Sequence, residues 1–314
     1  MLNRRLIRIK TFQALFGELG QTKSNPTTVA NNVKKSMHGM GNNLLAVLNF
    51  LPTFMHYMET EHNPTDYKYR TSDDDLKHFN LITQNTFVAK LMEIGEMDAQ
   101  SQRPTIDWHL DKDTMFVIYK AIKQTDFYAL AFSLSLPLSD RTFLEFSRSF
   151  YKYLLLDSVE FEQLIEDKNI YWYDEKIPIL KAIEKIFDGY EQNGIIEIPK
   201  LFKNEPEDLQ MADDLVEVYF AHKAEIDESI SKYTPGWDSE RITKIDYMLI
   251  TMALLEFKYM PLIPVKVTLN EYIEIAKMYS TPKSSKFVNG TLDKILSDWK
   301  EQKIIQKKGR GLIG

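Results

Sequence analysis

Apolar residues at helical spacing run through this chain and restrict what it can fold into. In one segment most intervals are three or four residues, at Ile242, Ile245, Leu249, Met252 and Ala253. The same spacing returns in the last segment, at Val288, Leu292, Ile295 and Trp299. Positions repeated in this way lie on one face of an amphipathic helix. Because such a face must pack against neighbours, the pattern predicts helices that cover one another.

Strand signals are weak in comparison. Residues 264–268 alternate between apolar and other residues, but they stand alone and lead directly into a helical pattern over 270–277. Thr281 followed by Pro282 predicts the N-cap and first position of the last helix, where proline loses no hydrogen bond. Further helix starts are predicted at 73–77, 139–143 and 238–242. We therefore predict an all-α protein of about ten helices.

The composition sets the class of protein. The 314 residues are 44% hydrophobic and 27% charged, as in ordinary soluble globular proteins. No cysteine is present, which excludes disulfides and thiolate metal sites and suits a cytoplasmic location. No signal-peptide pattern opens the chain, and the longest apolar stretch, 44–55, is too short to cross a bilayer. With a net charge of −6, the protein can bind a polyanion only at a local site.

Signals for catalysis or metal binding are poor. The chain has no cysteine nucleophile, no glycine-rich phosphate loop and no HExxH sequence, so we expect neither an enzyme nor a cofactor. His56 and His62 are six residues apart, on different faces of a helix, so no metal site is expected. Residues 171–173, Tyr-Trp-Tyr, are either an exposed stacking surface or, as we favour, a loop packed on the core.

A cluster of basic residues marks the N-terminus, at Arg4, Arg5, Arg8 and Lys10. On a helix Arg4 and Arg8 share a face, beside an apolar stripe formed by Ile9, Phe12 and Phe16. Arginine suits phosphate because its planar group donates two parallel hydrogen bonds and stays charged. The cluster is either a phosphate-binding surface or simply a solvated helix face.

Two sequences carry a resemblance to a known family. Residues 13–16, QALF, follow the basic cluster, and residues 284–295, SSKFVNGTLDKI, begin the last helix. With the helical segment between residues 239 and 279, they resemble the NusB family of bacterial transcription antitermination factors. The resemblance implies a NusB-like helical bundle of two packed helical subdomains, and an RNA-binding protein rather than an enzyme.

The resemblance covers residues 1–19 and about 206–298, so about 20–205 is expected to be a folded helical insertion. The expected division is 1–205 for an N-terminal helical subdomain with the insertion, 206–299 for the C-terminal subdomain and 300–314 for a basic flexible tail. We expect the insertion to cover the apolar stripe of the first helix, through apolar helices at 44–51 and 143–156.

The resemblance implies an RNA site for boxA-type single-stranded RNA. Arg4, Arg5 and Arg8 fall on basic positions of the family's first helix, whereas Leu6 stands where many relatives have a further arginine. Beside this helix, the family's RNA surface includes the junction before the last helix, which matches Tyr279, Lys283 and Lys286. Tyrosine can stack on a base and lysine can neutralise a phosphate. Relatives often carry an acidic residue at position 283.

The resemblance also implies a protein partner, the ribosomal protein NusE. Asp246 matches an acidic position at which relatives contact NusE, and Phe16 is assigned to the same surface. We expect Asp246 to be exposed, and Glu256, on the apolar stripe, to be structural and bonded to a backbone N–H group. Gly290 inside a helical pattern suggests a close approach between helices, because glycine there costs about 1 kcal/mol.

The sequence thus predicts a transcription antitermination or termination factor that binds boxA-type RNA together with NusE. It would act in the RNA polymerase antitermination complex on ribosomal RNA operons. An alternative is the related N-terminal module of ribosomal RNA cytosine methyltransferases, although this chain ends after the module and lacks the cysteine nucleophile. Another is a protein-interaction scaffold that does not bind RNA.

Overall fold

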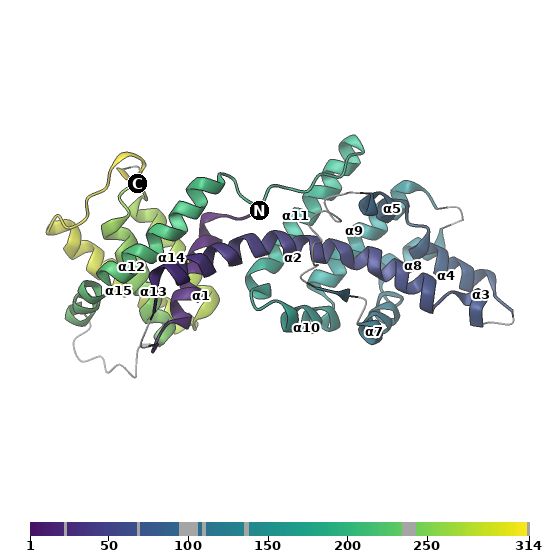
Figure 1. The fold of residues 1–314 in the computed structure, drawn as a ribbon, viewed down its shortest axis with the longest axis horizontal. Coiled ribbons are helices and arrows are strands. Elements are labelled where there is room, and N and C mark those ends of the chain that lie inside the picture. The colour runs from purple at the N-terminus through teal and green to yellow at the C-terminus, as the bar shows by residue number, and fades with distance from the viewer. Residues whose placement is uncertain are drawn as a thin grey trace. The chain divides into compact units, whose positions relative to one another are not determined.

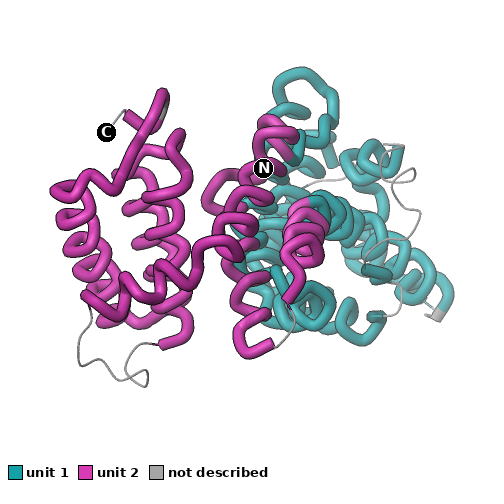
Figure 2. Tube along the Cα trace, turned by 60° about the vertical axis from the view of Figure 1, so that its left-hand side comes forward, with its two compact units in different colours: residues 1, 38–201 teal, residues 2–37, 202–314 magenta. Residues whose placement is uncertain are grey.

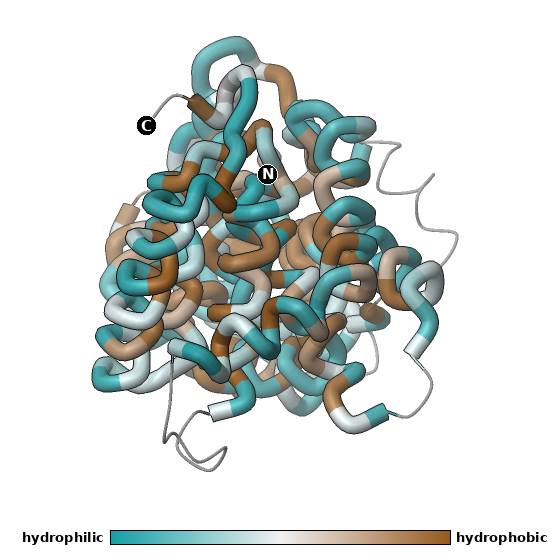
Figure 3. The backbone as a smooth tube through the Cα atoms, turned by 90° about the vertical axis from the view of Figure 1, so that its left-hand side faces the viewer, coloured by the Kyte–Doolittle hydropathy of each residue, from teal (hydrophilic) through white to brown (hydrophobic). Residues whose placement is uncertain are grey.

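The computed structural model describes residues 1–21, 24–67, 70–93, 106–108, 111–134, 138–233 and 243–312. Throughout these ranges the regular structure is helical and no strand is present, which confirms the predicted all-α class. Along the helices apolar and polar stretches alternate (Figure 3), as expected of amphipathic segments. Among the described helices, none is both long and apolar enough to cross a membrane.

The chain divides into two compact units (Figure 2). Unit 1 contains residue 1 and residues 38–201, and unit 2 contains residues 2–37 and 202–314. Helix α2, Pro26–Glu61, begins in unit 2 and continues into unit 1.

Unit 2 holds the first helix and the C-terminal helices. Its helices are α1 (Arg4–Gly17), the start of α2, α12 (Glu205–Tyr233), α13 (Lys244–Tyr259), α14 (Val265–Tyr279), α15 (Pro282–Glu301) and the 3-10 helix η2 (Gly309–Leu312). Helix α13 is central: α1, α12, α14 and α15 all pack against it (Figure 1). Because it has neighbours on every side, α13 is buried continuously from Met248 to Phe257.

The helix ends of unit 2 follow from local sequence. Thr281 accepts a hydrogen bond from the Ser284 N–H and Pro282 occupies the first turn, so the predicted start of α15 is confirmed. The alternating stretch 264–268 is the beginning of α14 rather than a strand. Helix α13 is capped by Thr243, and the predicted start at 238–242 lies outside the described residues.

Unit 1 is helical, as the periodicity of this segment indicates. Its helices are the remainder of α2, α3 (Pro64–Tyr67), α4 (Asp73–Thr83), α5 (Thr86–Met92), α7 (Lys112–Ile122), α8 (Asp126–Ser133), α9 (Asp140–Leu156), α10 (Val159–Lys168) and α11 (Trp172–Asn193). Aromatic rings from α2, α9 and α10 pack together, at Phe50, Phe54, Phe150 and Phe161. Two donors bond to α2 carbonyls: the Trp108 indole to Ala46 at 2.7 Å and the Tyr151 hydroxyl to Leu48 at 2.5 Å.

The described helices outnumber the ten predicted, because short helices such as α3 and α5 are too brief to show a full apolar period. The aromatic run 171–173 also differs from the expected loop, since α11 begins within it. Trp172 is buried, whereas the Tyr173 side chain next to it is exposed.

Candidate nucleic-acid interface

The start of helix α1 is fixed by Asn3, whose side chain accepts a 2.9 Å hydrogen bond from the Leu6 N–H. This cap places Arg4 and Arg5 in the first turn. The opposite, apolar side of α1 packs against α12, α13 and α14, so that Ile7, Ile9 and Leu15 are buried. The helices at 44–51 and 143–156, which were expected to cover this stripe, belong to unit 1. Their part in covering α1 stays a prediction.

Arg8 lies in the interior of unit 2. Its Nε and Nη2 atoms donate to the two oxygens of Glu256 at 2.8 and 2.7 Å, and both side chains are no more than 1% exposed. Thr268 donates its hydroxyl to Glu256 at 2.6 Å, and the Tyr272 hydroxyl lies 3.4 Å from the same carboxylate. Burial by itself would lower the pKa of Arg8, but Glu256 outweighs it and holds that pKa above its ordinary value.

This arrangement corrects two expectations. Arg8 is not presented to solvent, because Glu256 occupies its guanidinium group inside the core. Glu256 is structural, as predicted, but its partner is this guanidinium group rather than a backbone N–H.

Arg5 and Arg4 remain nearer the surface and are also paired. Arg5 donates from Nε and Nη2 to Glu271 of α14, at 2.7 and 3.2 Å, and is 39% exposed. The hydrogen bonds that Arg5 donates to Glu271 raise the pKa of Arg5. Arg4, 51% exposed, lies 3.7 Å from Glu207 of α12. These two arginines are therefore the members of the cluster that solvent can reach.

The junction between α14 and α15 lies beside α1. The Tyr279 hydroxyl accepts a 3.0 Å hydrogen bond from Gln13, and its ring meets Phe12 edge-on at 5.2 Å between centroids. Lys283 and Lys286 are exposed in the first turns of α15. The structure thus brings the tyrosine predicted for RNA against the predicted RNA-binding helix.

The two residues predicted for a protein partner are placed differently. Phe16 is half-buried, with its ring 5.7 Å from that of Phe12. Asp246 is only 2% exposed, so its expected exposure is wrong; α13 is surrounded by other helices even in its first turn. Its Oδ1 atom has no hydrogen-bond partner among the described residues. Asp246 is ten residues from Glu256 along α13, about 15 Å at the rise of an α-helix.

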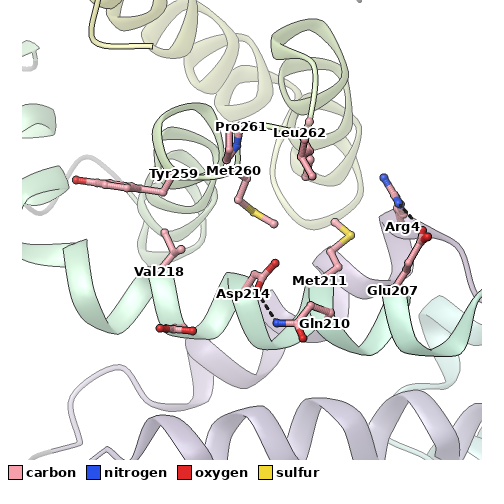
Figure 4. A pocket seen from close by; sticks show the side chains of 12 residues that line it. Arg4, Glu207, Gln210, Met211, Asp214, Val218, Tyr259, Met260, Pro261 and Leu262 are labelled. Atoms are coloured by element: carbon pink, nitrogen blue, oxygen red, sulfur yellow. Dashed lines mark hydrogen bonds and ion pairs between the residues drawn. The ribbon is translucent and has the colours of Figure 1, made fainter. Parts of the chain in front are cut away.

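A pocket of about 680 Å³ opens beside Arg4 (Figure 4). Arg4 and Glu207 stand at one end and Tyr259 at the other, with Met211 and Met260 between them. The lining consists of Arg4, Glu207, Gln210, Met211, Asp214, Glu217, Val218, Tyr259, Met260, Pro261, Leu262 and Ile263. With three carboxylates and one arginine, the lining of this pocket is poorly suited to a polyanion.

The segment after α15 binds the end of α13. The Lys307 ammonium donates to the carbonyl oxygens of Glu256 and Met260, at 3.1 and 3.0 Å. The Lys308 N–H donates to Pro261 at 3.0 Å, and a Cβ atom at Gly311 would come within 2.0 Å of the same carbonyl oxygen. Residues 307–311 therefore pack over the loop that follows α13, at Met260 and Pro261.

Sequence reasoning missed Glu207, Glu271, Thr268, Tyr272 and Lys307. One signal was available: Arg8 stands between two isoleucines that both prove buried, and Glu256 continues an apolar stripe. A cation and an anion that each lie on an apolar helix face are expected to pair, because burying either charge alone costs free energy. The carboxylates opposite Arg4 and Arg5 carry no comparable signal.

No group of histidine and acidic residues in the described ranges has the arrangement of a metal site. His62 instead bonds to the Tyr57 hydroxyl at 2.6 Å and stacks on Phe116.

Comparison with known proteins identifies the family. The model of the NusB family matches residues 179–297. Similar proteins include the transcription antitermination protein NusB of Salinibacter ruber, 39% identical over 143 residues, which are 45% of this chain and 88% of that protein. The NusB protein of Listeria monocytogenes is 42% identical over 117 residues, 37% of this chain and 90% of that protein.

The NusB protein of Chloroherpeton thalassium is 46% identical over 89 residues, which are 28% of this chain and 42% of that protein. No solved structure matches the chain. Since this chain covers most of the Salinibacter and Listeria proteins at about 40% identity, it belongs to the NusB family.

Proposed function

We propose that this protein is a transcription antitermination factor that binds boxA-type single-stranded RNA through one face of unit 2. The relatives are named as transcription antitermination proteins. The observation that carries the proposal is the placement of exposed Arg4 and Arg5 on α1, a helix that Tyr279 also contacts.

The chemistry of this face suits a flexible polyanion. Arg5 can offer a planar group to a phosphate, while the exposed Lys283 and Lys286 add charges at the start of α15. The N-terminus of that helix supplies further backbone donors for a phosphate. Tyr279 offers a ring on which an unstacked base can rest. Arg8 would act indirectly, by holding α1 in place through Glu256.

We further propose that the protein works with NusE in the RNA polymerase antitermination complex on ribosomal RNA operons. Asp246 and Phe16 are the residues proposed for NusE.

The RNA contact is tested by replacing Arg4 and Arg5 with alanine and measuring affinity for a boxA-type RNA oligonucleotide across a range of salt concentrations. For each phosphate that is no longer neutralised, the slope of log affinity against log salt should fall by about 0.7. A control for the loss of a positive charge elsewhere is Lys90→Ala, which removes one exposed charge from α5 in unit 1. An unchanged slope for the double arginine variant would contradict phosphate binding here.

The partner contact calls for a conservative change, because Asp246 is buried. Asp246→Asn keeps the size of the side chain and removes its charge. We expect weaker binding to purified NusE in a titration, with little change in thermal stability. Parental affinity for NusE would show that Asp246 serves only the fold.

A further inference from the structure

The arginines of α1 differ in how firmly their carboxylates hold them. The Arg4–Glu207 pair is a single 3.7 Å contact between side chains that are both more than half exposed, so it is weak. The Arg8–Glu256 pair is sealed inside the core. The Arg5–Glu271 pair lies between these extremes, with two hydrogen bonds and exposures of 39% and 22%. It is better bonded than the Arg4 pair and more accessible to solvent than the Arg8 pair.

Glu271 uses the edge of Arg5 that a phosphate would use. The carboxylate accepts from Nε and Nη2 together, which is the bidentate geometry that also joins arginine to phosphate. While this pair is closed, that edge is occupied and the charge of Arg5 is neutralised locally.

A second carboxylate stands one turn further along α14. Glu274 bonds to Lys277 at 2.6 Å and adds to the negative field at Arg5. If Glu271 released Arg5, it would stand beside Glu274 close to the incoming phosphate, and the like charges would repel. Opening the pair therefore costs free energy both in broken hydrogen bonds and in repulsion.

Resting on the RNA-binding function proposed above, we propose that Glu271 is an internal competitor for RNA. Its carboxylate occupies the edge of the Arg5 guanidinium group that a phosphate would bind. When RNA binds, a phosphate replaces this carboxylate. Glu271 thereby sets the affinity of this face, lowering it below what the arginine alone would give.

The experiment is to replace Glu271 with glutamine in the full chain and to measure binding of a boxA-type RNA oligonucleotide by fluorescence anisotropy. Glutamine keeps the length and a hydrogen-bond acceptor but removes the charge. We expect binding to become about twofold to fivefold tighter, the range set by the usual strength of a partly exposed ion pair.

Two matched variants separate the competitor role from a general change in charge. Glu274→Gln makes the same charge change one turn away, without freeing the guanidinium group, and should have a smaller effect. In an Arg5→Ala background, Glu271→Gln should give little further gain, because the residue acts through Arg5. Thermal melting of each variant shows whether the fold is retained.

The outcomes are distinct. If the parent binds RNA and Glu271→Gln binds equally or more weakly, the competitor proposal is wrong and the RNA-binding function stands. An equal gain from Glu274→Gln, or a gain that persists without Arg5, also overturns it. If neither the parent nor Glu271→Gln binds RNA, the proposed function fails and the competitor role fails with it.

Discussion

A buried charge depends on its partner, and Arg8 with Glu256 is the clearest case in this protein. Each side chain would be unpaired in an apolar interior without the other. We expect Arg8→Met to lower the free energy of unfolding by about 3 to 5 kcal/mol, because Glu256 stays buried without its cation. Urea denaturation measures this loss.

A second change serves as the control. Adding Glu256→Gln to Arg8→Met removes the stranded charge while keeping an acceptor for Thr268 and Tyr272. Part of the missing stability should return. If the double variant is as unstable as the sum of the single ones, the two side chains do not depend on each other as the geometry indicates.

Lys307 gives a prediction that depends on pH. Burial lowers the pKa of Lys307 from its ordinary value to about 8. Between pH 8 and the ordinary value of 10.5, the unfolded chain holds a proton that the folded chain has released. Stability contributed at this position therefore rises with pH through that window.

The measurement compares the parent with Lys307→Gln, in which this titration is absent. The difference in unfolding free energy should shift in favour of the parent between pH 8 and 10.5. A difference that stays constant across this range would show that Lys307 has an ordinary pKa in the folded protein.

At the scale of single helices, Gly290 in α15 departs from expectation. A Cβ atom there would meet nothing within 4 Å, so the predicted close approach between helices is wrong. Gly290→Ala should stabilise the protein by about 1 kcal/mol through helix propensity alone. Thermal melting tests this. A variant that gains no stability would mean that the helix is strained at this position.

Local sequence predicted the helices and their ends well. Thr281 and Ser139 cap their helices by accepting hydrogen bonds from residues three positions later, so a short stretch of sequence contains the whole cause. Local sequence could not predict which side chains pair between helices. In the sequence Arg8 looks like one member of a basic cluster, because its partner Glu256 lies 248 residues later and is brought beside it only by the fold. Asp246 likewise reads as a surface charge until the helices around α13 are assembled.

At the scale of the whole molecule, unit 2 has the features of a domain that could fold alone. Its helices cover the apolar side of α1 themselves. We expect a chain in which residues 38–201 are replaced by a flexible Gly/Ser linker to melt cooperatively as a monomer. Calorimetry and size-exclusion chromatography test this. Aggregation would instead favour the expectation from sequence that the inserted segment completes the core of the first helix.

The pairing of Arg8 with Glu256 also has a consequence for folding during synthesis. During synthesis at about 5 to 20 residues per second, some 12 to 50 s pass between the emergence of one partner and the other. Through this interval the first helix leaves the ribosome with its apolar side uncovered and its arginine unmatched, while unit 1 is being made. The oldest part of the nascent chain is thus among the last to settle, and it is there that a cellular chaperone would find its substrate.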